Sequence, residues 1–532
     1  MSDLLGWNAL LAGIVSIPEL ALTLDSSTMP VPPDEERRLR PEIERALVEM
    51  AALERGQLAN RDENRMVGHY WLRAPELAPT QEIRQAIETA REDVAAFAGA
   101  VRRGEVAAPD GMAFERVLHV GIGGSALGPQ LACDALAGPA DPVRVEFLDN
   151  TDPDGIERTL QTLGDHLART IGIVVSKSGG TKETQNGLEL LAARLRSHGL
   201  DPARQLVAVT GQGSALDRRA RGEGWLGVFP MWDWVGGRTS LTSAVGLLTM
   251  SLAGFDVDAL LDGARVMDEA TRDPDVAKNP AARLALCWHA AGGGAGRRDM
   301  VVIPYKDRLA LFSRYLQQLV MESLGKERDL EGRVVRQGLT VYGNKGSTDQ
   351  HAYIQQLREG IDNHFVTLIA VLEDGEGAPP HEVEPGIHAG DYLLGFLLGT
   401  RRALVEAGRL VSTIVVPRVD ARSLGALVAL FERTVGLYAG MLRINAYHQP
   451  GVEAGKRAAG TILEVQRALV AAMRERPGTW AGADAWAEES GHGTHAVEAL
   501  WLLEHLVANG RDGVARRGAV GDPGAEFSVT AG

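Results

Sequence analysis

Residues 171–187 read IGIVVSKSGGTKETQNG, an apolar and largely β-branched run that ends in a loop of hydroxyl and glycine residues. The run over residues 171–175 predicts a buried strand, and the leucines spaced after Thr181 predict a helix. The first N–H groups of a helix have no partner within the helix, and the helix dipole favours negative charge there. A plain turn capped by one hydroxyl is the alternative interpretation. Three hydroxyls, two glycines and a lysine in one loop favour a phosphate site.

The composition is that of a globular enzyme with more than one core-forming unit: 532 residues, of which 45% are hydrophobic and 23% charged. The formal net charge of −15 argues against nucleic acid or an anionic membrane as a partner, because both bind basic surfaces. Any phosphate must therefore be held by local geometry. Cys133 and Cys287 lie far apart and outside any CxxC pattern. This favours a reducing compartment, the cytoplasm, over a disulfide framework or a zinc site.

Two apolar stretches need to be told apart from targeting or membrane segments. Residues 1–24 contain Asp3 and Glu19 and no basic stretch, so we expect no signal peptide. Residues 239–255 are uncharged but interrupted by serine, threonine and glycine. We expect them to contain a buried helix and not a membrane span.

The order of elements predicts an α/β fold with two doubly wound parallel sheets, because short apolar strands alternate with helices. The expected strands lie near residues 117–120, 143–148, 171–175, 206–210 and 225–230, and again near 300–303, 364–372 and 410–416. We expect an N-terminal helical region at 1–113, a first α/β domain at 114–285, a second at 286–475 that includes a closing helix, and a C-terminal extension at 476–532. The end of that extension, past Gly510, is predicted to be loosely ordered.

A second glycine loop, GIGGSA at residues 121–126, satisfies the dinucleotide fingerprint G-x-G-x-x-[G/A]. Asp149 ends the next strand, where an acid that binds a ribose would lie. An NAD-dependent enzyme is therefore a rival interpretation. However, neighbouring loops at the carboxyl ends of parallel strands face one crevice. Residues 121–126 and 176–181 can thus converge on one phosphorylated ligand, with Gly124 and Ser125 lining the sugar side of the pocket.

The second half of the chain carries candidate catalytic groups. In RYLQQLVMESLGK, residues 314–326, Gln318 and Glu322 share one helix face, and a nearby glycine marks the end of the helix. An ion pair between Glu322 and Lys326 at i,i+4 is the structural alternative. In QGLTVYGNKGSTDQHA, residues 337–352, a glycine-rich loop leads to His351, an arrangement typical of an active-site rim.

Two more cations stand at unusual places. In HQPGVEAGKRAAG, residues 448–460, Lys456 lies near the start of a helix, where the dipole disfavours a cation. In WVGGRTS, residues 234–240, Arg238 lies in a glycine loop before an apolar helix, a good position for a cation that faces an oxyanion. A solvated surface lysine is the alternative for Lys456. The pair His492 and His495 is interpreted as a surface pair and not as a metal site.

Taken together, these segments resemble the phosphoglucose isomerase (glucose-6-phosphate isomerase) family. The motifs that carry the resemblance stand in the family's order: GIGGSALGP at 121–129, SKSGGTKET at 176–184, GGRTS at 236–240, QQLVMESLGK at 317–326, STDQH at 347–351 and GVEAGK at 451–456. The resemblance implies two sugar-isomerase (SIS) α/β domains and a homodimer with active sites at the subunit interface. It implies no metal or other cofactor.

The resemblance also implies roles for particular residues. Glu322 is similar to the base that moves a proton between C1 and C2 of the sugar through an enediol(ate), and Arg238 to the arginine that stabilises that intermediate. His351, contributed by the neighbouring subunit, and Lys456 resemble the ring-opening pair. The residues that would bind the sugar phosphate are Ser176, Lys177, Ser178, Gly179, Gly180 and Thr181, with Gly124, Ser125, Gln318 and Gln449.

Reversible isomerisation of glucose 6-phosphate to fructose 6-phosphate, a step of glycolysis and gluconeogenesis, is therefore the expected function. An isomerase that also accepts mannose 6-phosphate or prefers another aldose phosphate is one alternative. A non-catalytic SIS protein that senses sugar phosphates is another. Such a binder needs the loop at 176–181 but not Glu322, His351 and Lys456 together, and their joint presence favours the enzyme.

Overall fold

The strands after residue 113 form a five-stranded parallel sheet in the computed structural model of this chain, which describes residues 5–375 and 381–529 and, at 453, 454, 456 and 457, the backbone alone. The strand order is β4-β3-β5-β6-β7. Their bounds are β3 (Arg116–Val120), β4 (Arg144–Leu148), β5 (Thr170–Ser176), β6 (Leu206–Thr210) and β7 (Gly227–Pro230). The predicted parallel sheet is confirmed.

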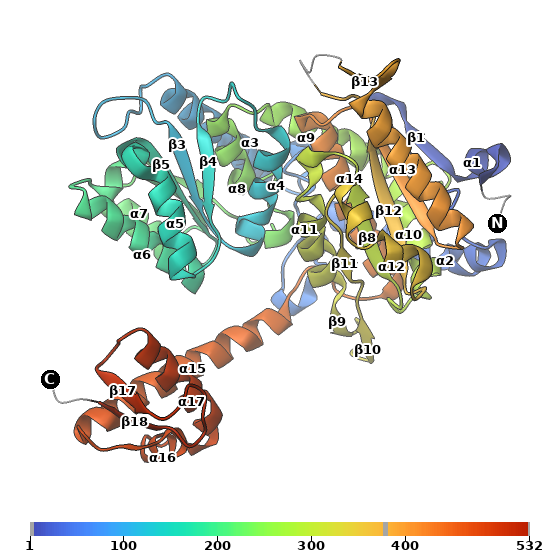
Figure 1. Cartoon of the computed structure of the whole chain (residues 1–532). Coiled ribbons are helices and arrows are strands. Elements are labelled where there is room, and N and C mark those ends of the chain that lie inside the picture. Colours follow the sequence, from blue (N-terminus) through green and yellow to red (C-terminus); the bar gives the residue numbers. More distant parts are fainter. Residues whose placement is uncertain (1–4, 376–380, 530–532) are drawn as a thin grey trace. The chain divides into compact units, whose positions relative to one another are not determined.

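Helices cover both faces of this first sheet, which explains why its strands are apolar on both sides. Along β5, Ile173 and Val175 face one hydrophobic cluster and Val174 faces another. Figure 1 shows α5, α6 and α7 beside the strands, and these helices belong to the cluster that contains Val174. The helices α3 and α8 contact the opposite face of the sheet, in the cluster that contains Ile173 and Val175. The helices span α3 (Gln81–Arg102), α4 (Leu127–Leu136), α5 (Pro153–Leu163), α6 (Lys182–Ser197), α7 (Ala215–Glu223) and α8 (Ala244–Ala253). Every residue of α8 is buried, as predicted for residues 239–255.

A second sheet of six strands has the order β1-β2-β15-β12-β8-β11. The strands β8 (Asp299–Pro304), β11 (Val341–Tyr342), β12 (His364–Val371) and β15 (Val411–Val416) are parallel. One face packs on α12 (Ile354–Glu359) and α13 (Ala389–Glu406), and the other on α10 (Pro280–Gly292), α11 (Phe312–Leu316) and α14 (Ala421–Leu442). The two predicted α/β sheets are therefore both present.

The N-terminal region differs from the helical region that was predicted for residues 1–113. After α1 (Trp7–Gly13), an antiparallel pair of strands, β1 (Ile14–Ile17) and β2 (Leu22–Asp25), joins the edge of the second sheet through β15. Each strand has only four residues, in which buried and more exposed side chains alternate. That period of two indicates a half-buried strand. The helices expected beyond it are present as α2 (Pro33–Glu54) and α3.

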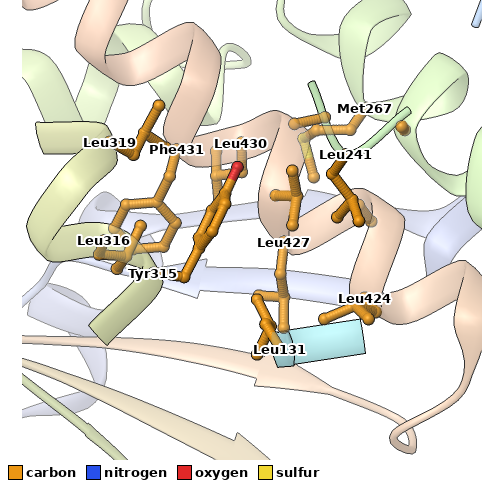
Figure 2. Packing of buried hydrophobic residues seen from close by; sticks show 14 of the residues in the cluster. Leu131, Leu241, Met267, Tyr315, Leu316, Leu319, Leu424, Leu427, Leu430 and Phe431 are labelled. Atoms are coloured by element: carbon orange, nitrogen blue, oxygen red, sulfur yellow. The ribbon is translucent and has the colours of Figure 1, made fainter. Parts of the chain in front are cut away.

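The core of this unit is organised around α14, which packs against α2, α9 (Val257–Ala270) and α10. Figure 2 shows Leu427, Leu430 and Phe431 of α14 in one cluster with Leu131 of α4 and Tyr315 of α11. Among the described residues, α14 is the one helix long and apolar enough to cross a membrane, but 94% of its apolar window is buried inside the structure. It is therefore a core helix.

A buried ion-pair network ties the segment after α2 to this core. Arg73 donates from Nη1 to Glu432 at 2.6 Å and from Nη2 to Asp268 at 2.9 Å, and all three side chains are almost fully buried. A second buried cation, Arg433, lies 3.7 Å from Asp268, so that two arginines face the two carboxylates, as buried charges require. The N-terminal segment is thus locked against α9 and α14.

A smaller unit, Gln449–Gly532, follows the larger unit Met1–His448. It contains α15 (Pro450–Glu475), α16 (Ala483–Glu489) and α17 (Ala496–Ala508), with a sheet of the order β16-β18-β17. Within this unit, α15, the helix that was expected to close the second α/β domain, packs on α16, α17 and β18. The prediction of a loose end past Gly510 is wrong. Residues there form β17 (Val514–Arg517) and β18 (Glu526–Val529), because Phe527 and Val529 complete a core with Trp486.

Candidate active site

The loop that opens α6 keeps hydroxyl groups available to a ligand. Thr181 is the N-cap residue of α6, but its side chain makes no capping hydrogen bond. Its hydroxyl accepts from Ser176 Oγ at 3.2 Å, and Ser178 Oγ accepts from the N–H of Gly180 at 3.1 Å. Gly179 has a φ of +68°, and a Cβ there would lie 2.4 Å from the backbone nitrogen of Leu216. The loop thus has the shape of an anion site, which favours the phosphate interpretation over a simple cap.

Lys177 connects this loop to the segment that carries Arg238. Its Nζ donates to the carbonyl oxygen of Asp233 at 3.0 Å and to that of Val235 at 3.1 Å. Burial, with repulsion from Arg65, lowers the pKa of the Lys177 ammonium to about 8. The two hydrogen bonds to Asp233 and Val235 occupy two of the three N–H donors of the ammonium. Its position suits an electrostatic contribution to phosphate binding together with a structural role.

The glycine loop at 121–126 packs backbone to backbone against the loop of Arg238. A Cβ at Gly124 would lie 2.2 Å from the carbonyl carbon and oxygen of Gly237, and Ser240 Oγ donates to the Gly124 carbonyl oxygen at 3.1 Å. At Gly123, with φ +59°, a Cβ would lie 3.2 Å from Gln318 Nε2. The structure therefore brings Gln318 and the 121–126 loop together, as expected from the sequence.

Ser125 contributes its backbone to this arrangement. The Nε2 of His119 hydrogen-bonds to the Ser125 carbonyl oxygen at 2.6 Å, and Nδ1 lies 2.9 Å from the Thr249 hydroxyl. A carbonyl can only accept, so Nε2 carries the proton and Nδ1 accepts from Thr249. Burial lowers the pKa of His119 to about 4. A neutral, buried histidine thus supports the end of β3 beneath the glycine loop.

The features that suggested a dinucleotide site have other partners. The Asp149 carboxylate, expected to bind a ribose, accepts from Gln130 Nε2 at 2.8 Å and from Arg314 Nη2 at 3.4 Å. Beside Gly123, the second glycine of the fingerprint, lies Gln318, whose Nε2 would be 3.2 Å from a Cβ at that position. The geometry therefore does not favour the NAD interpretation.

Glu322 and Arg238, the predicted base and the predicted cation of the site, are hydrogen-bonded to each other. Arg238 Nε donates to Glu322 Oε2 at 3.0 Å, and its Nη1 donates to Ser323 Oγ at 3.2 Å. The Arg238 side chain is 6% exposed and that of Glu322 is 18% exposed. Burial lowers the pKa of the guanidinium, and the attraction of Glu322 opposes this shift. A carboxylate that still reaches solvent is thus held by a buried cation.

The backbone that carries Glu322 is a π-helix, η10 (Gln317–Glu322), which continues α11. Such i→i+5 turns within helices are frequent at functional sites. Gln318 and Glu322 both belong to η10, so the two residues lie on one helical segment, as predicted. The alternative ion pair with Lys326 does not form. Lys326 Nζ instead donates to the carbonyl oxygen of Glu322 at 2.7 Å, which leaves the carboxylate to Arg238.

His351 lies at the end of a short 3-10 helix, η11 (Thr348–His351), and is exposed. Its side chain forms no hydrogen bond or ion pair with the side chains and backbone of the described ranges. The neighbouring side chains are fixed: Asp349 is buried and accepts from Tyr353 Oη, and Gln350 donates to Thr400 Oγ1 and to the Phe396 carbonyl oxygen. Hydrogen bonds to α13 therefore hold the residue before His351 in place, and His351 itself lies at the surface.

The other two predicted site residues belong to the smaller unit. Gln449 is the N-cap residue of α15, and Lys456 lies in the second turn of that helix. The Lys456 side chain lies outside the described residues. Among the described residues, no group of three or more histidine, cysteine, aspartate and glutamate side chains could hold a metal ion.

Sequence reasoning missed two features of the site, the π-helix and Lys326 as a backbone donor. In the sequence, the i,i+4 spacing of Glu322 and Lys326 in MESLGK indicated that these two residues are neighbours. It suggested the Glu322 carboxylate as the acceptor, whereas Lys326 donates to the Glu322 carbonyl oxygen. Ser240, which bonds the two glycine loops together, was also missed, because its partner Gly124 lies 116 residues away.

Comparison with known proteins identifies similar chains over nearly the whole length. A family model described as phosphoglucose isomerase matches residues 38–382 and 400–474. A glucose-6-phosphate isomerase of a Synechococcus species is 55% identical over 514 residues, which is 96% of each chain. Another from Geobacter sulfurreducens is 57% identical over 502 residues, 94% of each chain. The crystal structure of a glucose-6-phosphate isomerase from Chlamydia trachomatis is similar with a TM-score of 0.78 at 27% identity, and covers 87% of this chain and 92% of that one.

Proposed function

This chain belongs to the phosphoglucose isomerase family, and we propose how its residues interconvert glucose 6-phosphate and fructose 6-phosphate, the aldose–ketose step of glycolysis and gluconeogenesis. The observation that carries the assignment of roles is the hydrogen bond from Arg238 to Glu322 at 3.0 Å, beside the glycine loop at 121–126. A positioned base next to a fixed cation is what proton transfer beside a carbonyl requires.

The reaction begins with opening of the sugar ring. His351 and Lys456 act as acid and base at the ring oxygen and at O1, so that the C1–O5 bond breaks and C1 becomes an aldehyde carbon. Removal of the O1 proton supplies the electron pair for the new C=O bond, and protonation of O5 completes the step. Both residue types can exchange protons near neutral pH when suitably placed.

Isomerisation then moves one proton between neighbouring carbons. Glu322 takes the proton from C2, the C2–H electrons form a C1–C2 double bond, and the carbonyl π electrons pass to O1. Negative charge develops on the resulting cis-enediol(ate), and the buried Arg238 guanidinium stabilises it. The proton of the O2 hydroxyl passes to O1, Glu322 returns the carbon-bound proton to C1, and O2 becomes the carbonyl oxygen, which gives fructose 6-phosphate. Its hydrogen bond to Arg238 supports this assignment.

The phosphate anchors the substrate and takes no part in the chemistry. Ser176, Ser178 and Thr181 with the backbone of Gly179 and Gly180 bind the phosphate at the start of α6, and Lys177 adds positive charge. Gly124, Ser125, Gln318 and Gln449 contact the sugar. Two features support this binding mode. The Thr181 side chain makes no capping hydrogen bond to α6, and the helix dipole favours negative charge at this end of the helix. Remote binding energy of this kind helps to hold the reacting carbons in place.

We infer a homodimer in which His351 completes the active site of the partner subunit. The support comes from α13, whose residues Leu394, Phe396 and Leu398 are 42%, 45% and 54% exposed although the opposite side of the helix is buried on the sheet. An exposed apolar face of this kind is typical of a protein interface. Gln350, the residue directly before His351, donates hydrogen bonds to Phe396 and Thr400 of α13, and this link between the two segments also supports the inference. Two buried free thiols, Cys133 and Cys287, suit a cytoplasmic location.

One assay tests the function and separates the alternatives. The purified chain is incubated with fructose 6-phosphate, without added metal or nucleotide, and the formation of glucose 6-phosphate and mannose 6-phosphate is followed. We expect glucose 6-phosphate as the main product. Comparable formation of mannose 6-phosphate would indicate the broader specificity, and binding of fructose 6-phosphate without turnover would indicate a sugar-phosphate sensor.

A further inference from the structure

Lys326 is buried beside the proposed base in a way that the mechanism does not use. The residue is 5% exposed, and its Nζ donates to the carbonyl oxygen of Glu322 at 2.7 Å and to that of His448 at 2.8 Å. No carboxylate among the described residues lies within ion-pair distance of it. Burial, together with repulsion from Arg238, lowers the pKa of its ammonium to about 8. The protein thus bears the cost of a buried cation for two backbone carbonyls.

One of these contacts has a simple local explanation. The last carbonyl groups of a helix lack partners, and a cation near that end interacts favourably with the helix dipole. A lysine that caps η10 from the surface would serve this purpose without burial. The second contact needs a different reason, because His448 lies 122 residues away along the chain. It is also the last residue of the larger unit, two positions before α15 begins at Pro450, and α15 is the helix that carries Lys456.

Arg238 reaches the same segment. Its Nη1 donates to the Ala446 carbonyl oxygen at 2.7 Å, and its Nη2 to the His448 carbonyl oxygen at 3.4 Å. Two buried cations therefore hold Glu322 from its two ends: Arg238 binds the carboxylate, and Lys326 binds the main-chain carbonyl. Both also bind residues 446–448. The geometry fixes the backbone of Glu322 relative to that segment.

We propose that Lys326 is a positioning residue for the isomerisation, which holds the backbone of Glu322 against the 446–448 segment and so keeps the carboxylate at the carbon atoms between which the proton moves. The inference rests on the proposed function of Glu322. Because substrate is bound mainly through the phosphate loop, loss of Lys326 acts on turnover and leaves binding nearly unchanged. Misplacement of a catalytic group by about 1 Å can lower the rate about 100-fold.

The test compares three variants at this position with a control in the full-length protein. Lys326→Met keeps the length of the side chain and removes its donors. Lys326→Gln keeps an N–H donor and replaces the methionine variant if that variant does not fold. Lys326→Arg keeps both the charge and the donors. Lys278→Met is the control, since that lysine is 71% exposed. The readouts are kcat and KM for fructose 6-phosphate, exchange of the C2 proton of glucose 6-phosphate with solvent, and the thermal unfolding midpoint.

We expect Lys326→Met to lower kcat and C2 proton exchange about 100-fold while KM stays within about threefold, and Lys326→Arg to recover part of the loss. The control should match the wild type. A kcat within about threefold of wild type in folded Lys326→Met or Lys326→Gln would overturn the inference. A fall in kcat that comes with an equally large rise in KM, and that Lys326→Arg does not relieve, would overturn it as well. An inactive wild type would instead overturn the proposed function, and the inference with it.

Discussion

Arg238 donates from Nε to Oε2 of Glu322 at 3.0 Å, although 84 residues separate them along the chain. Arg238 follows the last strand of the first sheet in the short helix η8 (Gly237–Thr239), and Glu322 ends the π-helix that comes after β8 of the second sheet. The pair therefore joins the two α/β halves of the larger unit at the point where the glycine loop 121–126 also meets them. The predictions below test what this junction does.

Replacement of Glu322 by Gln should abolish proton transfer and preserve the architecture of the site. The amide oxygen can still accept from Arg238, but the amide cannot take the C2 proton. General-base catalysis contributes about 10²–10⁴-fold to a rate, and we expect kcat and C2 proton exchange to fall by at least about 10³-fold. Binding of fructose 6-phosphate should change less than about threefold. Glu327→Gln, at an exposed neighbouring position, is the control. Exchange at the wild-type rate in Glu322→Gln would remove Glu322 from the role of base.

Loss of a hydroxyl from the phosphate loop should weaken binding more than turnover. Ser178→Ala and Thr181→Ala each remove one proposed donor to the phosphate, and a hydrogen bond to a charged group contributes about 1.5–3 kcal/mol, which corresponds to a rise in KM of about tenfold or more. We expect kcat to change less than about threefold. Ser197→Ala, at the far end of the same helix, should leave both constants unchanged. A fall in kcat at constant KM would contradict the anchoring role.

Gly124→Ala should damage the site through backbone crowding alone. The added Cβ would lie 2.2 Å from the carbonyl carbon of Gly237 and 2.8 Å from the backbone nitrogen of Arg238, so one of the two loops must move. We expect kcat/KM to fall by about 100-fold, because displacement of Arg238 misplaces the cation. The control is Gly222→Ala, where a Cβ would meet nothing within 4 Å. Wild-type kinetics in Gly124→Ala would show that the loops tolerate separation.

These particular residues show what sequence can and cannot predict in this fold. The parallel strands of both sheets, except the two-residue strand β11, were predictable, because buried parallel strands are continuous apolar runs such as residues 171–175. The strand pair β1–β2 and the end of the C-terminal unit were not, because strands of four residues give too short a pattern. Long-range hydrogen bonds, such as that from Lys326 to the carbonyl of His448, leave no trace in local spacing.

His119 should make the protein less stable in acid. Its pKa is about 4 in the folded chain, whereas an exposed histidine titrates near 6.5. As the pH falls below 6.5, the unfolded chain binds the proton first, so the free energy of unfolding decreases. The full loss, reached below the folded pKa, is about 3 kcal/mol from this residue.

The measurement is the free energy of unfolding of wild type and His119→Gln between pH 7 and pH 4. The variant is expected to be less stable at pH 7, because Ser125 and Thr249 lose their partner, but its stability should fall less steeply with acidification. Other buried histidines such as His69, whose pKa is also lowered by burial, account for the slope that remains. Parallel curves for the two proteins would contradict a proton-linked role for His119.

A shared active site can be tested by mixing two inactive subunits. Glu322→Gln and His351→Ala homodimers should each be nearly inactive if His351 serves the partner's site. A hybrid dimer then contains one site with both defects and one site with neither, so it should regain about half of the wild-type activity, since each active site works independently in this scheme. The hybrid is prepared by co-expression with two different tags and purified over both.

The same argument makes α13 necessary for activity. Leu398→Glu places a charge on the exposed side of α13, and burial of an unpaired charge at the proposed interface is strongly unfavourable. We expect this variant to sediment as a monomer with little activity, whereas Val48→Glu, at a residue 67% exposed on α2, should remain an active dimer. An active monomeric Leu398→Glu variant, or hybrids no more active than their parents, would place His351 in the active site of its own chain or outside the mechanism.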